Sequence, residues 1–345
     1  MIRVLIVDDS PSAAEFLSNV ISSDPEMEII GVAANGAEGL KMAERLRPDV
    51  ISMDINMPVM DGFETTRRIM SSCPIPIVIV SSIYNADSVV LAFKAIEAGA
   101  LDIINKPSAS SGSGENRGVR DLLLTLKAMA GVKVIRRSAD KIAPLAAERP
   151  AIAVTQSQIK LVCIGASTGG PPVIQEILAS LPADFPAPIL IVQHITPGFS
   201  AGFATWLDNT TSLSVHMASP GELPLPGHVY IASDNLHLEL LPDGRLNLTS
   251  HPVCNGVRPS VSRLFHSAMA VFRNSALGII LSGMGKDGAE ELKLMRDAGA
   301  VTIAQDQASS VVFGMPGEAV KLGGATYVLP AYSIAAMIKN LVKPI

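Results

Sequence analysis

The first third of the chain alternates short apolar runs with longer amphipathic segments. The runs are rich in β-branched residues and have the length of buried strands. They lie at residues 4–7, 28–32, 50–53, 75–80 and 101–104. The segments between them, such as residues 37–45, place apolar side chains at helical spacing. This pattern predicts a parallel sheet that is covered by helices.

A second alternating pattern begins at the apolar run of residues 159–164, which leads into Gly165-Ala166-Ser167-Thr168-Gly169-Gly170. Further runs with the character of buried strands lie at residues 189–192, 228–232, 277–281 and 300–304. Residues 238–248 surround Pro242-Asp243-Gly244 and predict a surface hairpin. The chain is therefore expected to contain a second, doubly wound α/β domain.

The region between the two patterns has a different composition. Residues 108–114 are almost all Ser and Gly and predict a flexible loop, whereas residues 119–130 have helical periodicity. Residues 131–158 are rich in Ala, Arg and Pro without a clear period. A chain of 345 residues fits two domains. We therefore expect domains at 1–130 and 159–345, joined by a linker at 131–158.

Composition and charge narrow the class of protein. Hydrophobic residues make up 48% of the chain and charged residues 17%, which predicts globular domains. The net charge of -5 and the lack of a long Lys/Arg run argue against nucleic acid as a partner. No apolar run reaches the roughly 18 residues that a membrane span needs, and the N-terminus has no signal-peptide pattern. The expected location is the cytoplasm, without membrane insertion.

Polar residues follow four strands of the first predicted sheet. They are Asp8-Asp9, Asp54, Ser81-Ser82 and Lys106. Ligands of parallel sheets bind at the carboxyl ends of the strands, where these side chains converge. Three carboxylates at one edge predict a bound Mg²⁺, and a carboxylate beside a lysine can accept a phosphoryl group. Taken singly, each Asp could instead be a helix N-cap or a turn residue.

The segment Met53-Asp54-Ile55-Asn56-Met57-Pro58-Val59-Met60-Asp61-Gly62 resembles the phosphoacceptor loop of two-component receiver domains. The resemblance implies a flavodoxin-like receiver that a histidine kinase phosphorylates. It assigns roles by position: Asp54 as phosphoacceptor, Asp8 and Asp9 as the acidic pair for Mg²⁺, Asn56 as a backbone metal ligand, Ser81 as the switch hydroxyl and Lys106 as the phosphate-pairing cation. Many receivers carry Tyr or Phe where this chain has Ile103. The resemblance therefore does not extend to an aromatic switch residue at this position.

The second domain carries a candidate nucleophile. Gly165-Ala166-Ser167-Thr168-Gly169 fits G-x-S-x-G between a predicted strand and helix, a turn that exposes the Ser hydroxyl beside backbone N–H groups. Such Gly/Ser turns also cradle phosphates or simply end strands. His194 follows a predicted strand and is the candidate base. Asp287 and Asp306 both follow strands, and their spacing does not decide which one orients that base.

Residues 159–345 resemble the catalytic domain of chemotaxis response-regulator protein-glutamate methylesterases, the CheB family. The resemblance rests on residues 165–170, 193–194, 258–261, 283–288, 304–306 and 314–316. It implies Ser167 as nucleophile, His194 as general base and Asp287 as its orienter, with the Met284 backbone as an oxyanion donor.

The same resemblance implies a hydrolase without a catalytic-domain cofactor. Its substrates would be glutamate methyl esters, and also glutamines, on methyl-accepting chemotaxis receptors. A competing hypothesis is a non-catalytic response regulator whose C-terminal domain only binds a protein partner. Mutation of Ser167 separates the two hypotheses.

Overall fold

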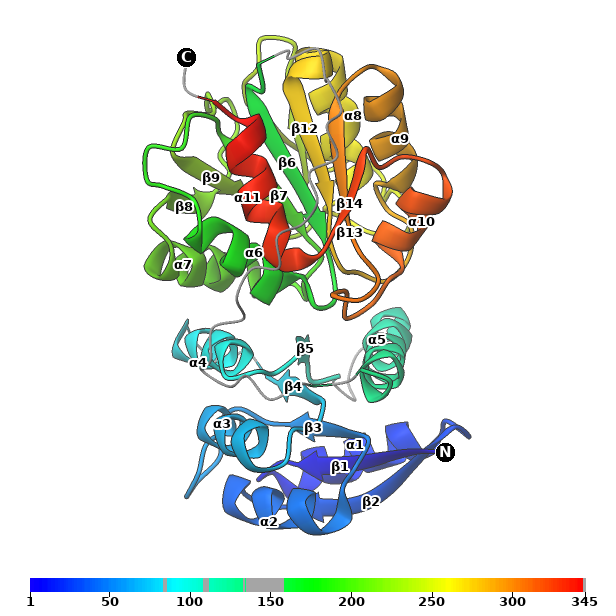
Figure 1. Ribbon diagram of the computed structural model, residues 1–345. Coiled ribbons are helices and arrows are strands. Elements are labelled where there is room, and N and C mark those ends of the chain that lie inside the picture. The colour runs from blue at the N-terminus through cyan, green and yellow to red at the C-terminus, as the bar shows by residue number, and fades with distance from the viewer. Residues whose placement is uncertain (83–85, 108–111, 133, 135–157, 344–345) are drawn as a thin grey trace.

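The computed structural model describes residues 1–82, 86–107, 112–132, 134 and 158–343. It consists of an N-terminal and a C-terminal α/β body (Figure 1). Each body is built on its own parallel sheet, so the expected fold class is confirmed. Most of the predicted linker, residues 131–158, lies outside the described residues.

The N-terminal body is a five-stranded parallel sheet in the order β2-β1-β3-β4-β5. Its strands are β1 Ile2–Val7, β2 Met27–Ala33, β3 Val50–Met53, β4 Ile77–Ser81 and β5 Asp102–Asn105. Its helices are α1 Pro11–Ser22, α2 Gly36–Leu46, α3 Gly62–Ser72, α4 Ala86–Glu97 and α5 Gly112–Ala130. All five predicted strands are present within two residues of their expected bounds.

Local sequence signals account for several of these elements. The four residues of β3 are all buried, as expected of a β-branched run in the middle of a sheet. Helix α1 begins after Ser10, whose hydroxyl accepts from Ala13 N, and Pro11 occupies its first turn. Helix α3 begins after Asp61, whose carboxylate accepts from Glu64 N at 2.7 Å. These caps hold the loops that follow β1 and β3 at the carboxyl edge of the sheet.

The C-terminal body contains a seven-stranded parallel sheet in the order β14-β13-β12-β6-β7-β9-β8. Its strands are β6 Leu161–Ala166, β7 Ile189–Gln193, β8 Ser214–Met217, β9 His228–Ile231, β12 Ala276–Ile280, β13 Val301–Gln305 and β14 Tyr327–Leu329. Its helices are α6 Gly170–Ala179, α7 Ser200–Thr210, α8 Val261–Phe272, α9 Ala289–Asp297, α10 Met315–Lys321 and α11 Ala331–Leu341, with a 3-10 turn at Arg273–Ser275.

Several elements differ from the sequence-based expectation. The predicted hairpin is present as β10 His237–Leu240 and β11 Leu246–Thr249. The edge strands β8 and β14 were not predicted. Residues 112–114, expected in a loop, belong instead to α5, while residues 108–111 lie outside the described residues. The helix predicted at 119–130 therefore begins earlier than its apolar periodicity indicates.

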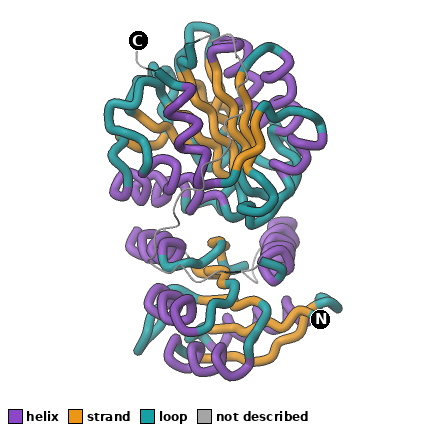
Figure 2. Tube along the Cα trace, in the orientation of Figure 1, coloured by secondary structure: helices purple, strands orange, loops and turns teal. Residues whose placement is uncertain are grey.

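The two bodies meet through α4 on one side and α7 on the other. Figures 1 and 2 show α4 and α5 on the side of the N-terminal sheet that faces the C-terminal body. Phe93 of α4 lies against Phe203 and Trp206 of α7, with ring centroids 5.6 and 5.2 Å apart. One hydrophobic cluster includes these rings and residues of both sheets. The contact between the bodies is therefore a packed apolar interface.

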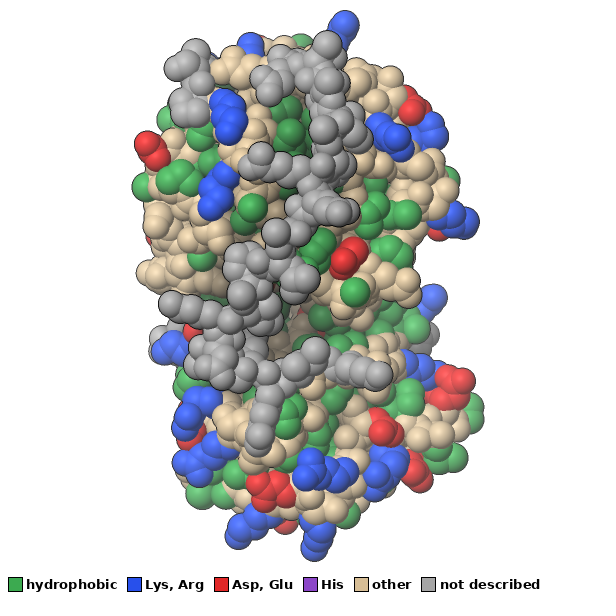
Figure 3. Space-filling model, viewed as in Figure 1, with side chains coloured by type: hydrophobic (Ala, Val, Ile, Leu, Met, Phe, Trp, Pro, Cys, Tyr) green, Lys and Arg blue, Asp and Glu red, His purple; other side chains and the backbone are tan. Residues whose placement is uncertain are grey.

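The outer surface shows no concentration of positive charge on the face in Figure 3. Lys and Arg side chains are interspersed there with Asp and Glu. Among the described residues, no helix combines the length and apolar character that crossing a membrane requires.

Candidate functional site

Ser167 lies in a tight turn between β6 and α6. Its backbone N donates to Ser282 O at 3.0 Å, which ties the turn to the residues that follow β12. Gly169 has φ of 75°, and a Cβ on it would lie 2.4 Å from Val311 Cβ. Only glycine fits both the left-handed conformation and the close packing. The turn therefore presents the Ser167 hydroxyl at the carboxyl edge of the sheet.

His194 directly follows β7, which pairs with β6. Its backbone N donates to Ala166 O at 2.8 Å, and its ring Nε2 lies 3.0 Å from Asp287 Oδ2. An ionised carboxylate has no proton to donate, so Nε2 carries the hydrogen of this bond. The unprotonated nitrogen of the neutral ring is then Nδ1. This nitrogen is the one that can accept a proton from a nucleophile.

Asp287 is 4% exposed and accepts several hydrogen bonds. Ser260 Oγ donates at 2.7 Å and Asn255 Nδ2 at 3.0 Å to Oδ1, while Val261 N donates at 2.6 Å to Oδ2. Burial alone would raise the pKa of this carboxyl, but the bonds from His194, Asn255 and Ser260 outweigh burial and lower it. Asp287 is thus held ionised beside the imidazole.

The two candidate aspartates occupy different environments. Asp287 meets the His194 ring, whereas Asp306 Oδ1 accepts from Ser309 N at 2.9 Å and Ser309 Oγ at 2.7 Å. Asp306 therefore stabilises its own loop, and the geometry favours Asp287 as the partner of His194. Asn255 and Ser260 were missed as partners of this carboxylate, although Ser260 lies in the Arg258-Pro259-Ser260-Val261 segment.

Ser167 and His194 line a common cavity of about 570 Å³. Ser167, His194 and Met284 line it from the C-terminal body, while Asp102 and Ile103 line it from the N-terminal body. Within the described part of the chain, Ser167 Oγ makes no hydrogen bond to His194, a looseness common in free enzymes. The candidate nucleophile and base share one cavity, and one wall of that cavity belongs to the other domain.

A second cluster of polar residues lies at the carboxyl edge of the N-terminal sheet. Ligand oxygens of Asp8, Asp9 and Asp54 lie within 4.8 Å of one another. Lys106 Nζ is 2.7 Å from Asp8 Oδ2 and 2.6 Å from Asp54 Oδ2. Four of the residues expected here from sequence are therefore brought together. Ser81, at the end of β4, is buried, and its Oγ has no hydrogen-bond partner among the described residues.

The charge balance of this cluster favours a cation. Burial raises the pKa of Asp8 in spite of the Lys106 contact. Burial alone would lower the pKa of Lys106, but its bonds to Asp54 and Asp8 outweigh burial and raise it. One ammonium does not balance three carboxylates. Oxygen donors at this spacing fit a hard divalent cation such as Mg²⁺. Asn56, expected from the sequence to be a backbone ligand of this cation, lies two residues after Asp54.

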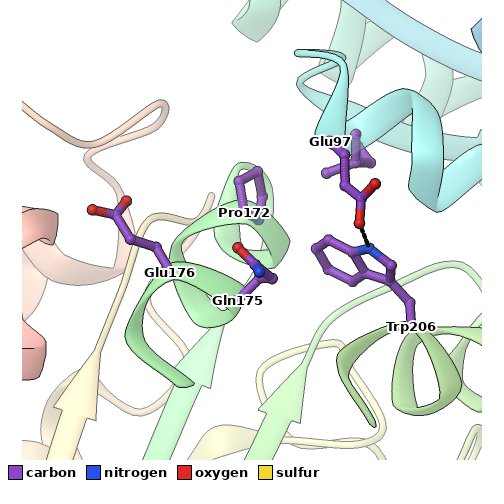
Figure 4. Close-up of a pocket in the computed structure, with 6 residues that line it drawn as sticks. Glu97, Pro172, Gln175, Glu176 and Trp206 are labelled. Carbon is purple, nitrogen blue, oxygen red and sulfur yellow. Dashed lines mark hydrogen bonds between the residues drawn. The ribbon is translucent and has the colours of Figure 1, made fainter. Parts of the chain in front are cut away.

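The N-terminal body contacts the residue next to Ser167. Asp102 accepts from the Thr168 side chain and from Ile103 N, the latter at 2.8 Å. Burial of this carboxyl in the interface raises its pKa to about 6. At the rim of the interface, Figure 4 shows Glu97 of α4 pointing toward Trp206 of α7, whose Nε1 donates to Glu97 Oε1 at 2.5 Å. The two domains are thus joined by polar contacts as well as by the aromatic cluster.

Family models match both bodies. Residues 162–338 match the model described as CheB methylesterase, and residues 4–112 match the response regulator receiver domain.

Curated relatives match the whole chain. A protein of Syntrophus aciditrophicus is 49% identical over 99% of this chain and 98% of its own length, and one of Geobacter metallireducens is 48% identical over 99% of both. Both are named protein-glutamate methylesterase/protein-glutamine glutaminase. The crystal structure of the Thermotoga maritima CheB methylesterase catalytic domain is 41% identical, with a TM-score of 0.52. It covers 54% of this chain and 100% of that domain.

Proposed function

Since the chain belongs to the CheB methylesterase family and carries a receiver domain ahead of its catalytic domain, we propose that it is a phosphorylation-regulated protein-glutamate methylesterase and protein-glutamine glutaminase. Its substrates are glutamate methyl esters and glutamines on methyl-accepting chemotaxis receptors. The observation that carries the proposal is the His194–Asp287 pair, whose His194 side lines the same cavity as Ser167.

The proposed reaction begins with attack by Ser167 Oγ on the ester carbonyl. His194 Nδ1 takes the serine proton, and Asp287 stabilises the imidazolium that forms. The Met284 N–H, which has no acceptor in the described residues, is the candidate donor to the oxyanion. As the tetrahedral intermediate collapses, the proton passes from His194 to the departing methoxy group. Methanol leaves, and Ser167 carries a glutamyl ester.

Water completes the cycle by the same residues. His194 takes a proton from water, hydroxide attacks the glutamyl ester, and the proton returns to Ser167 as glutamate is released. With a glutamine side chain the first leaving group is ammonia instead of methanol, and the acyl intermediate is identical. One site thus supports both demethylation and deamidation.

The receiver controls this site through phosphorylation. We propose Asp54 as the phosphoacceptor, with a histidine kinase as phosphodonor and Lys106 and Ser81 as the groups that bind the new phosphoryl oxygens. Asp8, Asp9, Asp54 and the Asn56 backbone would hold Mg²⁺, which neutralises phosphoryl charge when bound. The Ser81 hydroxyl is buried without a partner in the described residues, which supports its role as a hydrogen-bond donor to the phosphoryl group.

Occlusion of the cavity supports a mechanism for that control. Asp102, Ile103 and Ile104 form part of the wall around Ser167, so the receiver obstructs the approach of a protein substrate while the domains stay packed. We propose that phosphate on Asp54 shifts the population toward an open arrangement. A purely partner-binding second domain has no use for the His194–Asp287 pair beside Ser167 and is not favoured.

Ser167→Ala tests the hydrolase directly. The variant should release no methanol from methyl-labelled receptors above background, because the acyl intermediate cannot form, while Asp54 still accepts phosphate from a phosphodonor. Ser180→Ala is the matched control on an exposed serine at the end of α6 and should keep wild-type rates. Methanol release by Ser167→Ala at more than a few percent of the wild-type rate would refute the serine mechanism.

A further inference from the structure

The amide of Gln193 connects the backbones of the two candidate catalytic residues. Gln193 is the last residue of β7 and is 5% exposed. Its Nε2 donates to Ser167 O at 2.9 Å and to His194 O at 2.8 Å. We propose that Gln193 is a positioning residue, which fixes the separation between the nucleophile and the base. This inference rests on the proposed function of Ser167 and His194.

The position of this amide follows from the sheet. Strands β6 and β7 pair up to Ala166 and Gln193, and His194 N donates to Ala166 O just beyond the last pair. Ser167 and His194 both lie past the end of the paired region. The bond from His194 N fixes only the backbone on the β6 side of the turn. The Gln193 amide extends the connection to the carbonyl of the nucleophile itself.

Gln193 Oε1 indicates that this arrangement is kept at a cost to stability. The oxygen is buried and has no hydrogen-bond partner within the described residues. It is enclosed closely, because a Cβ on Gly170 would lie only 2.4 Å from it. A buried acceptor without a donor destabilises the folded state. An apolar side chain of the same length would avoid this penalty but would leave the two main-chain carbonyls without the amide donor, so the glutamine is explained by those two bonds and not by packing.

The Gln193 amide holds the backbones of Ser167 and His194 at a fixed separation. Ser167 Oγ is not hydrogen-bonded to His194 in this arrangement of the described residues, so no side-chain contact holds the pair at reacting distance. Their approach depends on how the two backbones are held. A misplacement of about 1 Å at a reacting centre can lower the rate by about 100-fold. Gln193 contacts neither the reacting atoms nor the cavity, and it acts through the main chain of residues that do.

Gln193→Met in the phosphorylated full-length protein is the test. Methionine has nearly the length of glutamine and removes both donors together with the unpaired oxygen. We expect kcat for methanol release to fall by about 10- to 100-fold with KM for methylated receptors unchanged. The rate of Ser167 labelling by a fluorophosphonate should fall by a similar factor. The Tm should fall only modestly, because the loss of the unpaired Gln193 oxygen offsets part of the cost of the two lost hydrogen bonds.

Two further variants separate positioning from a structural role. Gln193→Glu keeps the shape but places a carboxylate against two carbonyl oxygens, so its kcat should fall at least as far. Gln305→Met removes a buried strand-end amide whose oxygen and nitrogen are both paired, to Ser282 N and Ser309 O, and should lower the Tm. It measures the effect of losing a buried strand-end amide that contacts neither Ser167 nor His194.

Failure of the positioning role and failure of the proposed function give different results. If Gln193→Met retains kcat within twofold of wild type, or loses activity only in proportion to its folded fraction, Gln193 does not position the pair. If the wild-type protein releases no methanol from receptors, the proposed function fails instead. In that case the fluorophosphonate labelling rates still compare Gln193→Met with wild type.

Discussion

The Asp102 side chain of the receiver accepts a hydrogen bond from Thr168, the residue that follows the candidate nucleophile. The residue as a whole is half-buried, but its carboxyl lies in the interface, where burial raises its pKa to about 6. When the domains separate, the carboxyl becomes hydrated and its pKa returns toward the usual value of about 3.9. The closed form therefore binds a proton more tightly than the open form. Closure is favoured at low pH and loses this contribution as the pH rises through about 6.

This linkage predicts that the unphosphorylated protein opens more at pH 8 than at pH 5. Trp206 is the only tryptophan in the sequence and lies in the interface, so its fluorescence reports opening without relying on catalysis. Asp102→Asn should flatten the pH dependence between 5 and 8, because the substituted side chain does not titrate. An unchanged profile in Asp102→Asn would show that other groups set it.

Asp287 and Asp306 can be separated by the same substitution. Asp287→Asn should lower kcat by about 10⁴-fold, because an amide does not hold the imidazole in the required tautomer. Asp306→Asn should keep kcat of the folded protein within about threefold, since the Asp306 carboxylate bonds only to Ser309 of its own loop in the part of the chain described. Initial rates of methanol release at saturating receptor decide between them. A larger loss in Asp306→Asn than in Asp287→Asn would reverse the assignment.

At the scale of elements, α4 packs closely on α7 where the latter carries Gly202. A Cβ on Gly202 would lie 2.0 Å from Val89 Cγ1, so any side chain there forces the two helices apart. Gly202→Val should therefore weaken the interface without touching the catalytic residues. A loss of about 1.4 kcal/mol of interface free energy gives about a tenfold rise in the activity of the unphosphorylated protein, provided that the closed form predominates.

The control for Gly202→Val is Ala201→Val, which places the same valine side chain at an exposed position on the same helix. It should leave the unphosphorylated rate unchanged. Equal rates in Gly202→Val and wild type, in a protein shown to be folded, would mean that the α4–α7 contact does not restrain the enzyme.

The sequence predicted the buried elements better than the exposed ones. Runs such as residues 50–53 are buried on both faces of a sheet, so they are continuously apolar and easy to identify. The edge strands β8 and β14 are only three or four residues long and partly exposed, so they carry no such signal. The start of α5 at Gly112 falls in a Gly/Ser segment whose composition favours a loop.

The candidate sites were predicted where chemistry and topology coincide. Ser167, His194 and Asp54 each follow a strand and carry a reactive group, so both signals agree. Asn255 and Gln193 were not assigned roles, because their contribution is a hydrogen bond whose partner is distant in sequence. The hydrophobic periodicity of the sequence does not reveal such a bond. Choosing Asp287 over Asp306 likewise needed a resemblance or the structure.

At the scale of the whole molecule, the two domains share one hydrophobic cluster and one cavity. The cluster passes from the receiver sheet through Phe93 to the rings of α7, and the cavity has walls from both domains. Any change at the Asp54 pocket that alters how α4 or β5 packs also alters access to Ser167. We therefore infer that closure and catalysis exclude one another, so phosphorylation acts on a population of closed molecules.

Occlusion by the receiver is tested by comparing methanol release from methylated receptors by three forms of the protein. They are the unphosphorylated full-length chain, the same chain with a phosphodonor and Mg²⁺, and a fragment of residues 151–345. We expect the fragment to be faster than the unphosphorylated chain and indifferent to the phosphodonor, while Asp54→Asn in the full-length chain stays slow. A folded fragment that is no faster than the unphosphorylated chain would contradict occlusion by the receiver.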